Sequence, residues 1–255
     1  MKKYFTLLFI TTLVFFAPTL KAQQYQPLNS NFESWSSANK PNNWNSYDEA
    51  SGTYKSFLPD NDDNIFRRSG SPSGSGSYFL TVAANKKVVG VLANGNITTG
   101  RMNAGSMSAS NVANNNQTIR SNSQYSQTFT ATPDSVYFWC SFYAASSSDK
   151  ASVRFYIHGN SDFKDHPSGD MNDATKYNRR AICEFTRTTS SSSSRTWVKK
   201  KFPFVAGSST PNYVLVTIAT NTTAGGGSQH DSISIDGASY DIGYGGLDHV
   251  IARSE

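Results

Sequence analysis

Apolar and polar residues alternate with a period of two along much of the chain after residue 77. Nine segments follow this pattern and are predicted to be β-strands: 78–83, 87–92, 124–130, 136–144, 151–158, 181–187, 197–204, 213–220 and 232–240. No segment has the 3.6-residue period of an amphipathic helix. Gly, Ser and Asn dominate the connections between the segments. We therefore expect an all-β fold, a jelly-roll β-sandwich, formed by residues 23–255 as a single domain.

Three central segments have one plainly apolar face, which predicts a core: Phe138, Cys140 and Phe142, then Val153, Phe155 and Ile157, then Ala181, Cys183 and Phe185. If these strands are neighbours, their opposite faces form one surface, the predicted platform: Tyr137, Trp139, Tyr143, Arg154, Tyr156, His158 and Glu184. Aromatic rings can cover the apolar faces of sugars, while charged and hydroxyl groups satisfy sugar hydroxyls. The platform therefore predicts a glycan partner. The alternative is that these aromatic residues are simply good strand formers on a partly covered sheet.

The first 22 residues have the layout of a secretory signal peptide. Lys2 and Lys3 precede an apolar run from Tyr4 to Ala17, and a small residue, Ala22, stands at the expected cleavage point. The whole chain has a net charge of +5, with 23 basic and 18 acidic residues. Cleavage removes three lysines and no acid, which leaves a net charge of +2. We expect an exported protein of the periplasm, cell surface or extracellular space, with no membrane insertion after cleavage and no nucleic-acid partner.

The amino-acid composition agrees with an all-β fold rather than a helical one. Charged residues make up 16% of the chain, and it holds 38 Ser and 22 Asn, which argues against a coiled coil or a helical bundle. The two cysteines, Cys140 and Cys183, lie on apolar strand faces. Export permits a disulfide between them, but two buried free thiols fit equally well.

Short motifs at both ends of the chain carry a resemblance to a known family: 31–35 (NFESW), 41–44 (PNNW), 94–100 (NGNITTG), 129–135 (FTATPDS) and 232–236 (SISID). The layout resembles the putative carbohydrate metabolism domain (PCMD) of exported and surface proteins from Gram-negative bacteria, and also jelly-roll carbohydrate-binding modules. The resemblance implies a jelly-roll sandwich associated with glycans. It supplies no catalytic residues. The run Tyr137 to Cys140 departs from the family pattern.

Jelly-roll modules of this type often hold a structural calcium between the first and last strands. The resemblance places Glu33 and Asp236 at these positions, and carboxylate oxygens suit calcium. We therefore expect a calcium ion as the one cofactor. In the alternative, both residues cap strand ends through hydrogen bonds.

A catalytic role would require two carboxylates across a glycosidic bond. Glu184 and an aspartate from the segment after His158 (Asp162, Asp165, Asp170 or Asp173) could form such a pair, but no spacing requires it. The alternatives to a non-catalytic carbohydrate-binding domain are thus a glycoside hydrolase and a structural or adhesive surface protein without a sugar site.

Four positive charges with no acid among them lie close to Trp197: Arg195, Lys199, Lys200 and Lys201. On a strand, Lys199 and Lys201 share a face with Trp197. Lysines on an exposed edge strand prevent edge-to-edge aggregation, and this reading is preferred. Contact with an acidic glycan is the main alternative.

Overall fold

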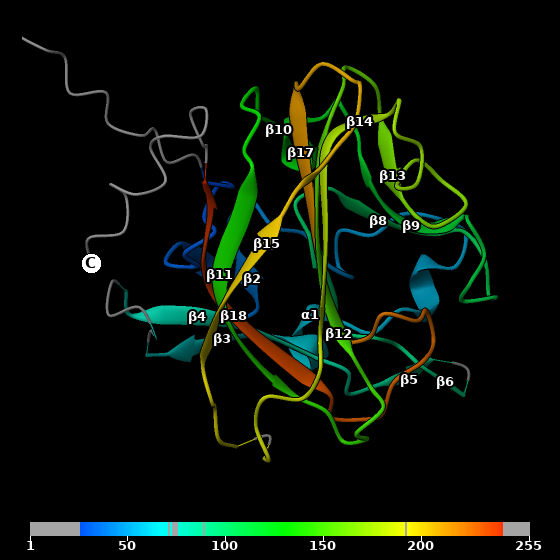
Figure 1. Ribbon diagram of the computed structural model, residues 1–255. Coiled ribbons are helices and arrows are strands. Elements are labelled where there is room, and N and C mark those ends of the chain that lie inside the picture. Colours follow the sequence, from blue (N-terminus) through cyan, green and yellow to red (C-terminus); the bar gives the residue numbers. More distant parts are fainter. Residues whose placement is uncertain (1–25, 71, 73–75, 89, 192, 242–255) are drawn as a thin grey trace, which may run out of the picture.

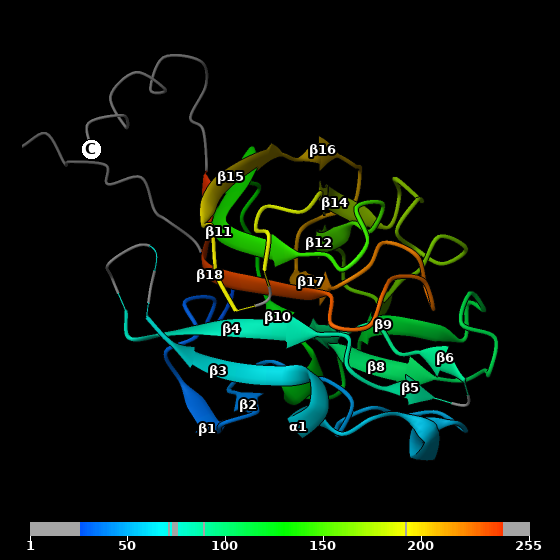
Figure 2. The same ribbon diagram turned by 90° about the horizontal axis from the view of Figure 1, so that it is seen from below.

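The computed structural model describes residues 26–241, except 71, 73–75, 89 and 192, and the predicted signal peptide lies outside these residues. Two antiparallel sheets face each other, which confirms the predicted β-sandwich of the jelly-roll class (Figures 1 and 2). The β11 sheet has the order β15 (Val198–Pro203), β11 (Ser135–Tyr143), β18 (Ser232–Asp241), β4 (Tyr78–Ala83) and β3 (Ile65–Ser69). The β12 sheet has the order β10 (Gln127–Thr128), β17 (Tyr213–Ala219), β12 (Ala151–His158), β14 (Tyr177–Phe185) and β16 (Val205–Ala206), and β7 (Asn96–Thr98) also pairs with β17.

The main core fills the space between these two sheets. The three apolar faces predicted from the alternation are all buried in it, as expected for side chains that alternate across a strand. Phe138 of β11 lies 5.8 Å from Phe155 of β12 and 5.7 Å from Phe185 of β14, measured between ring centroids. Cys140 and Cys183 are buried in the same core as free thiols. Burial raises the pKa of Cys140 to about 12, so this thiol stays protonated at neutral pH.

A smaller antiparallel sheet, the β9 sheet, forms a third layer. It has the order β13 (Phe163–Asp165), β9 (Asn114–Thr118) and β8 (Arg101–Ala104). In Figure 1 these strands lie beyond β12, β14 and β17, on the side away from β11. A second apolar cluster links the β12 and β9 sheets: Tyr156, Phe163, Met171, Tyr177 and Leu215. The face of the β12 sheet that points away from the main core is therefore largely covered.

The remaining elements are short: β1 (Trp35–Ser37), β2 (Lys40–Pro41), β5 (Lys87–Val88), β6 (Val91–Leu92), α1 (Asn61–Asn64) and two 3-10 turns, η1 (Lys55–Phe57) and η2 (Ser123–Tyr125). No helix in the described part of the chain is long and apolar enough to cross a membrane.

Candidate functional site

The structure divides the predicted platform between two sheets. β12 and β14 are neighbours, as assumed, but β11 belongs to the opposite sheet and pairs with β15 and β18. Since the core faces of β11 and β12 point toward each other, their other faces point in opposite directions. Tyr137, Trp139 and Tyr143 therefore cannot share a surface with Tyr156, and the single platform is wrong.

The β12 part of the platform is mostly interior, because the β9 sheet covers it. Tyr156 and His158 are completely buried. The hydroxyl of Tyr156 donates to Asp165 Oδ1 at 2.8 Å, and Arg154 Nη1 donates to the same oxygen at 3.1 Å. His158 stacks on Phe163. These side chains fill and connect two layers, which is a structural role.

Glu184 is the one β14 member of the predicted platform, and it is exposed. Its carboxylate lies 3.9 Å from Lys150 Nζ. Each of the four aspartates after His158 accepts at least one hydrogen bond within the protein. Asp162 Oδ1 accepts from the backbone of Arg120, and Asp165 accepts from Arg154 and Tyr156. Asp170 accepts from the backbone of Lys164 on β13, and Asp173 accepts from the backbone of Thr175. Arg154 interacts electrostatically with both Asp165 and Glu184, but Asp165 is fully buried and already paired with Arg154 and Tyr156, so it is not placed to act on a ligand together with Glu184.

The β11 part of the platform lies on a second surface, which we call the outer face of the β11 sheet. Strand register and alternation assign to it Phe66 and Arg68 of β3, Phe79 and Thr81 of β4, Ser234 and Asp236 of β18, Tyr137, Trp139, Ser141 and Tyr143 of β11, and Lys199 and Lys201 of β15. Trp139 and the two tyrosines are half-buried. Phe66 of β3 adds a partly exposed ring to this face, while Phe79 of β4 is buried. Trp197 stands immediately before β15 and packs edge-on against Phe79 at 5.0 Å.

Each of four cations lies against an aromatic ring of this face. Lys199 Nζ is 4.8 Å from the ring centre of Tyr137, and Arg187 Cζ is 5.3 Å from that of Tyr143. Arg68 lies 4.8 Å from the ring centre of Phe66, and Arg195 lies 5.0 Å from that of Phe79. A ring attracts a cation through its quadrupole but does not neutralise its charge. The face is therefore both aromatic and positively charged.

The middle of this face is a closely packed polar row. Ser234 Oγ lies 2.9 Å from Thr81 Oγ1 and accepts from Arg195 Nε at 3.1 Å. This contact holds the guanidinium of Arg195 above the sheet. Burial lowers the pKa of Arg195, and the positive charge of Arg68 lowers it further. The two guanidinium groups are therefore close enough to repel each other.

Sequence reasoning found part of this surface and missed part of it. The edge position of β15 is confirmed, and so is the shared face of Lys199 and Lys201, whereas Trp197 lies just before the strand. Arg195 was recognised as part of the basic cluster, but its position over Phe79 was not predicted. Arg68 was not expected either, because 65–69 was not predicted as a strand, and the position of the loop before β15 depends on tertiary packing. The alternation within 78–83 did mark Phe79 as opposite in face to Leu80.

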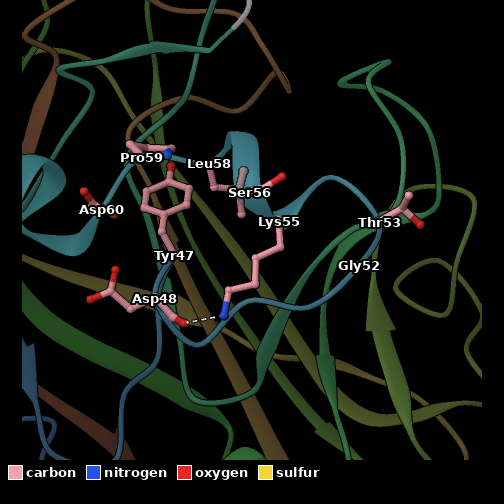
Figure 3. A pocket seen from close by; sticks show the side chains of 9 residues that line it. All are labelled: Tyr47, Asp48, Gly52, Thr53, Lys55, Ser56, Leu58, Pro59 and Asp60. Carbon is pink, nitrogen blue, oxygen red and sulfur yellow. Dashed lines mark hydrogen bonds between the residues drawn. The ribbon is translucent and has the colours of Figure 1, made fainter.

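A separate hollow of about 580 Å³ lies at the segment between Tyr47 and Asp60 (Figure 3). Its walls include Asp48, Lys55 and Asp60, and Lys55 Nζ donates to the backbone oxygen of Asp48 at 2.9 Å. Burial raises the pKa of Asp48, whose carboxylate also accepts from the backbone of Asn61 at 3.0 Å. The ring of Tyr47 is buried, so the hollow offers a sugar no exposed aromatic surface.

The two expected calcium ligands have different surroundings. Glu33 Oε1 accepts hydrogen bonds from the backbone N–H groups of Ser77 and Tyr78, both at 2.9 Å. Asp236 is buried on β18, in register with Trp139. The contacts of Glu33 match the alternative in which it caps a strand. Among the residues that the structure describes, no three His, Cys, Asp or Glu side chains are grouped as metal ligands.

Comparison with known proteins finds structures of a similar fold but no family. No family model matches the chain, so membership of the PCMD family stays a prediction. No curated protein matches it either. Two of the similar solved structures have titles that describe a "putative glycoside hydrolase". The one from Bacteroides thetaiotaomicron has a TM-score of 0.53 and 12% identity, over 74% of this chain and 60% of the other. The one from Bacteroides vulgatus has a TM-score of 0.53 and 14% identity, over 78% of this chain and 85% of the other. The chain thus spans 60% of the length of the first protein, and at these identities the similarity establishes the fold alone.

Proposed function

We propose that this protein is an exported, non-catalytic domain that binds glycan on the outer face of the β11 sheet. The observation that carries the proposal is the group of half-buried rings on β11, Tyr137, Trp139 and Tyr143, on a sheet face that the β9 layer does not cover. Aromatic side chains of this kind present an apolar surface with a polar edge, which suits a sugar ring. Two similar structures carry titles that describe glycoside hydrolase candidates, which supports the proposal. A structural or adhesive surface protein is the alternative if no glycan binds.

Replacing Trp139 with Ala is expected to weaken glycan binding at least tenfold, since a well-packed aromatic anchor contributes more to binding than the contacts around it. The measurement is affinity electrophoresis of the mature protein in gels that contain single polysaccharides, after a glycan array has identified those it binds. A circular dichroism melt establishes that the variant is folded.

The matched control is Phe57→Ala, which removes an exposed ring outside the β11 sheet. It should bind like the wild type. Equal binding by all three proteins would remove the β11 face as the glycan site. Absence of any binding by the wild type would favour the structural or adhesive alternative.

We keep a calcium ion held by Glu33 and Asp236 as a proposal with its own test. If the ion binds at a concentration 100-fold above its dissociation constant, it stabilises the fold by about 2.7 kcal/mol. EDTA should then lower the thermal midpoint by roughly 5 to 10 °C, and Glu33→Gln should lose this response. Gln retains an oxygen that can accept from Ser77 and Tyr78. A midpoint unchanged by EDTA would reject the ion and leave Glu33 as a strand cap.

A further inference from the structure

Two arginines lie near Phe79 on the outer face of the β11 sheet, each against a different ring. Arg68 of β3 is directly opposite Phe79 in the β3–β4 register, and the guanidinium of Arg195 lies over the ring of Phe79. Neither arginine forms a salt bridge with an acidic residue in the part of the chain that the structure describes. Of the acidic residues whose side chains the structure describes, strand register places Asp236 on this face, where it lies on β18 opposite Trp139. The positive charges of Arg68 and Arg195 repel each other, and no ion pair within the described residues offsets this cost, so a bound anionic group would recover free energy.

Protection of sheet edges does not account for this arrangement. β15 and β3 are the two edges of the β11 sheet, so the charges of Lys199 and Arg68 could serve to block edge pairing. Arg187 and Arg195, however, belong to the segment between β14 and β15, and they lie over rings of the inner strands β11 and β4. Positive charge therefore extends across the whole sheet.

The cations are also fixed in place before any ligand binds. Ring contacts hold all four, and the hydrogen bond to Ser234 additionally orients Arg195. Fixing the side chains in advance reduces the conformational entropy that binding must otherwise cost. The guanidinium group is planar, and two of its N–H groups match the two oxygens of a carboxylate or sulfate.

We propose that the outer face of the β11 sheet binds an acidic polysaccharide, with a carboxylate or sulfate group held between Arg68 and Arg195 and a sugar ring against Trp139. This inference rests on the proposed function and names its ligand class. Trp139 and Arg68 are separated by three strand spacings, about 14 Å. The ligand is therefore a chain of several sugars rather than one.

The experiment compares polygalacturonate with the same polymer after methyl esterification, which masks the carboxylates, and uses heparin as the sulfated probe. Binding to polygalacturonate should exceed binding to its ester at least tenfold and should weaken as salt is added. The variant R68Q/R195Q should lose at least tenfold in affinity for the acidic probes. Preference for polygalacturonate over heparin, or the reverse, identifies the anionic group.

The matched control is R67Q. Arg67 is the neighbour of Arg68 on β3 but belongs to the opposite face of the strand, where it lies over Tyr78. The R67Q variant should bind the acidic probes like the wild type. Equal binding of the ester and the acid, lost in Trp139→Ala, would overturn the acidic ligand while leaving glycan binding intact. Equally tight binding of oligo(dT), kept in Trp139→Ala but lost in R68Q/R195Q, would overturn the glycan as well, because it would show a general polyanion surface.

Discussion

Replacing Asp165 with Asn is expected to lower the free energy of unfolding by about 3 to 5 kcal/mol, the usual cost of removing one partner of a buried ion pair. The side chain of Asp165 is 0% exposed, and that of its partner Arg154 is 17% exposed. Asn retains an oxygen that can accept from the Tyr156 hydroxyl, but it cannot balance the positive charge of Arg154. Urea unfolding followed by tryptophan fluorescence measures the difference.

The control is Asp162→Asn, at the residue immediately before β13. Asp162 is 56% exposed and lies 3.6 Å from Arg120 Nε, and an exposed pair of this kind contributes less than about 1 kcal/mol. In addition, R154M/D165N should be less destabilised than the sum of its two single variants, because the two residues interact directly. If Asp165→Asn proved as harmless as Asp162→Asn, Arg154 would not depend on this partner and would become available as a ligand-binding group.

The alternation of residues in the sequence specified the faces of strands well. Val136, Phe138, Cys140 and Phe142 of β11 are buried, and so are Val153, Phe155 and Ile157 of β12. A period of two follows directly from the geometry of a strand, so it can be recognised without knowledge of the rest of the fold. It does not reveal in which sheet a strand lies. This is why Trp139 and Tyr156 were placed on one surface although they lie on opposite sides of the sandwich.

The third layer was missed for a different reason. β9 has the sequence NNNQT, which shows no apolar alternation, although Asn115, Asn116 and Thr118 are buried. Strands held by polar contacts have no signal in hydrophobic periodicity. Without that layer, Arg154, Tyr156 and His158 have the pattern of a solvent-facing row, because each carries a polar group at its tip. The β9 layer converts this row into interior structure.

His158 should make the protein less stable as the pH falls below neutral. Its ring is completely buried and is sandwiched between Phe163 and Tyr213, at 4.9 and 5.8 Å between centroids. Nδ1 lies 3.0 Å from the carbonyl oxygen of Gly159, and Nε2 lies 2.8 Å from Thr118 Oγ1. A neutral ring that donates from Nδ1 and accepts at Nε2 satisfies both contacts. Burial lowers the pKa of His158 from 6.5 to about 4.

The unfolded chain therefore binds a proton at this residue between pH 6.5 and pH 4, while the folded chain does not. The contribution of His158 to stability is complete above pH 6.5 and is lost as the pH falls through this range, by about 3 kcal/mol in total. Urea unfolding at half-unit steps from pH 7.5 to pH 4 measures the slope. His158→Gln should have lower stability throughout and a shallower slope between pH 6.5 and pH 4.

The comparison with His230→Asn isolates this effect, since His230 is exposed and has a φ of 76°, a backbone conformation that Asn tolerates. That variant should keep the wild-type slope. An NMR titration of the His158 ring in the folded protein gives the pKa directly and separates it from carboxylates that titrate in the same range. A value near 6.5 would mean that the ring exchanges with solvent. The β9 layer would then open readily, and the row of Arg154, Tyr156 and His158 would regain the exposure that a binding surface requires.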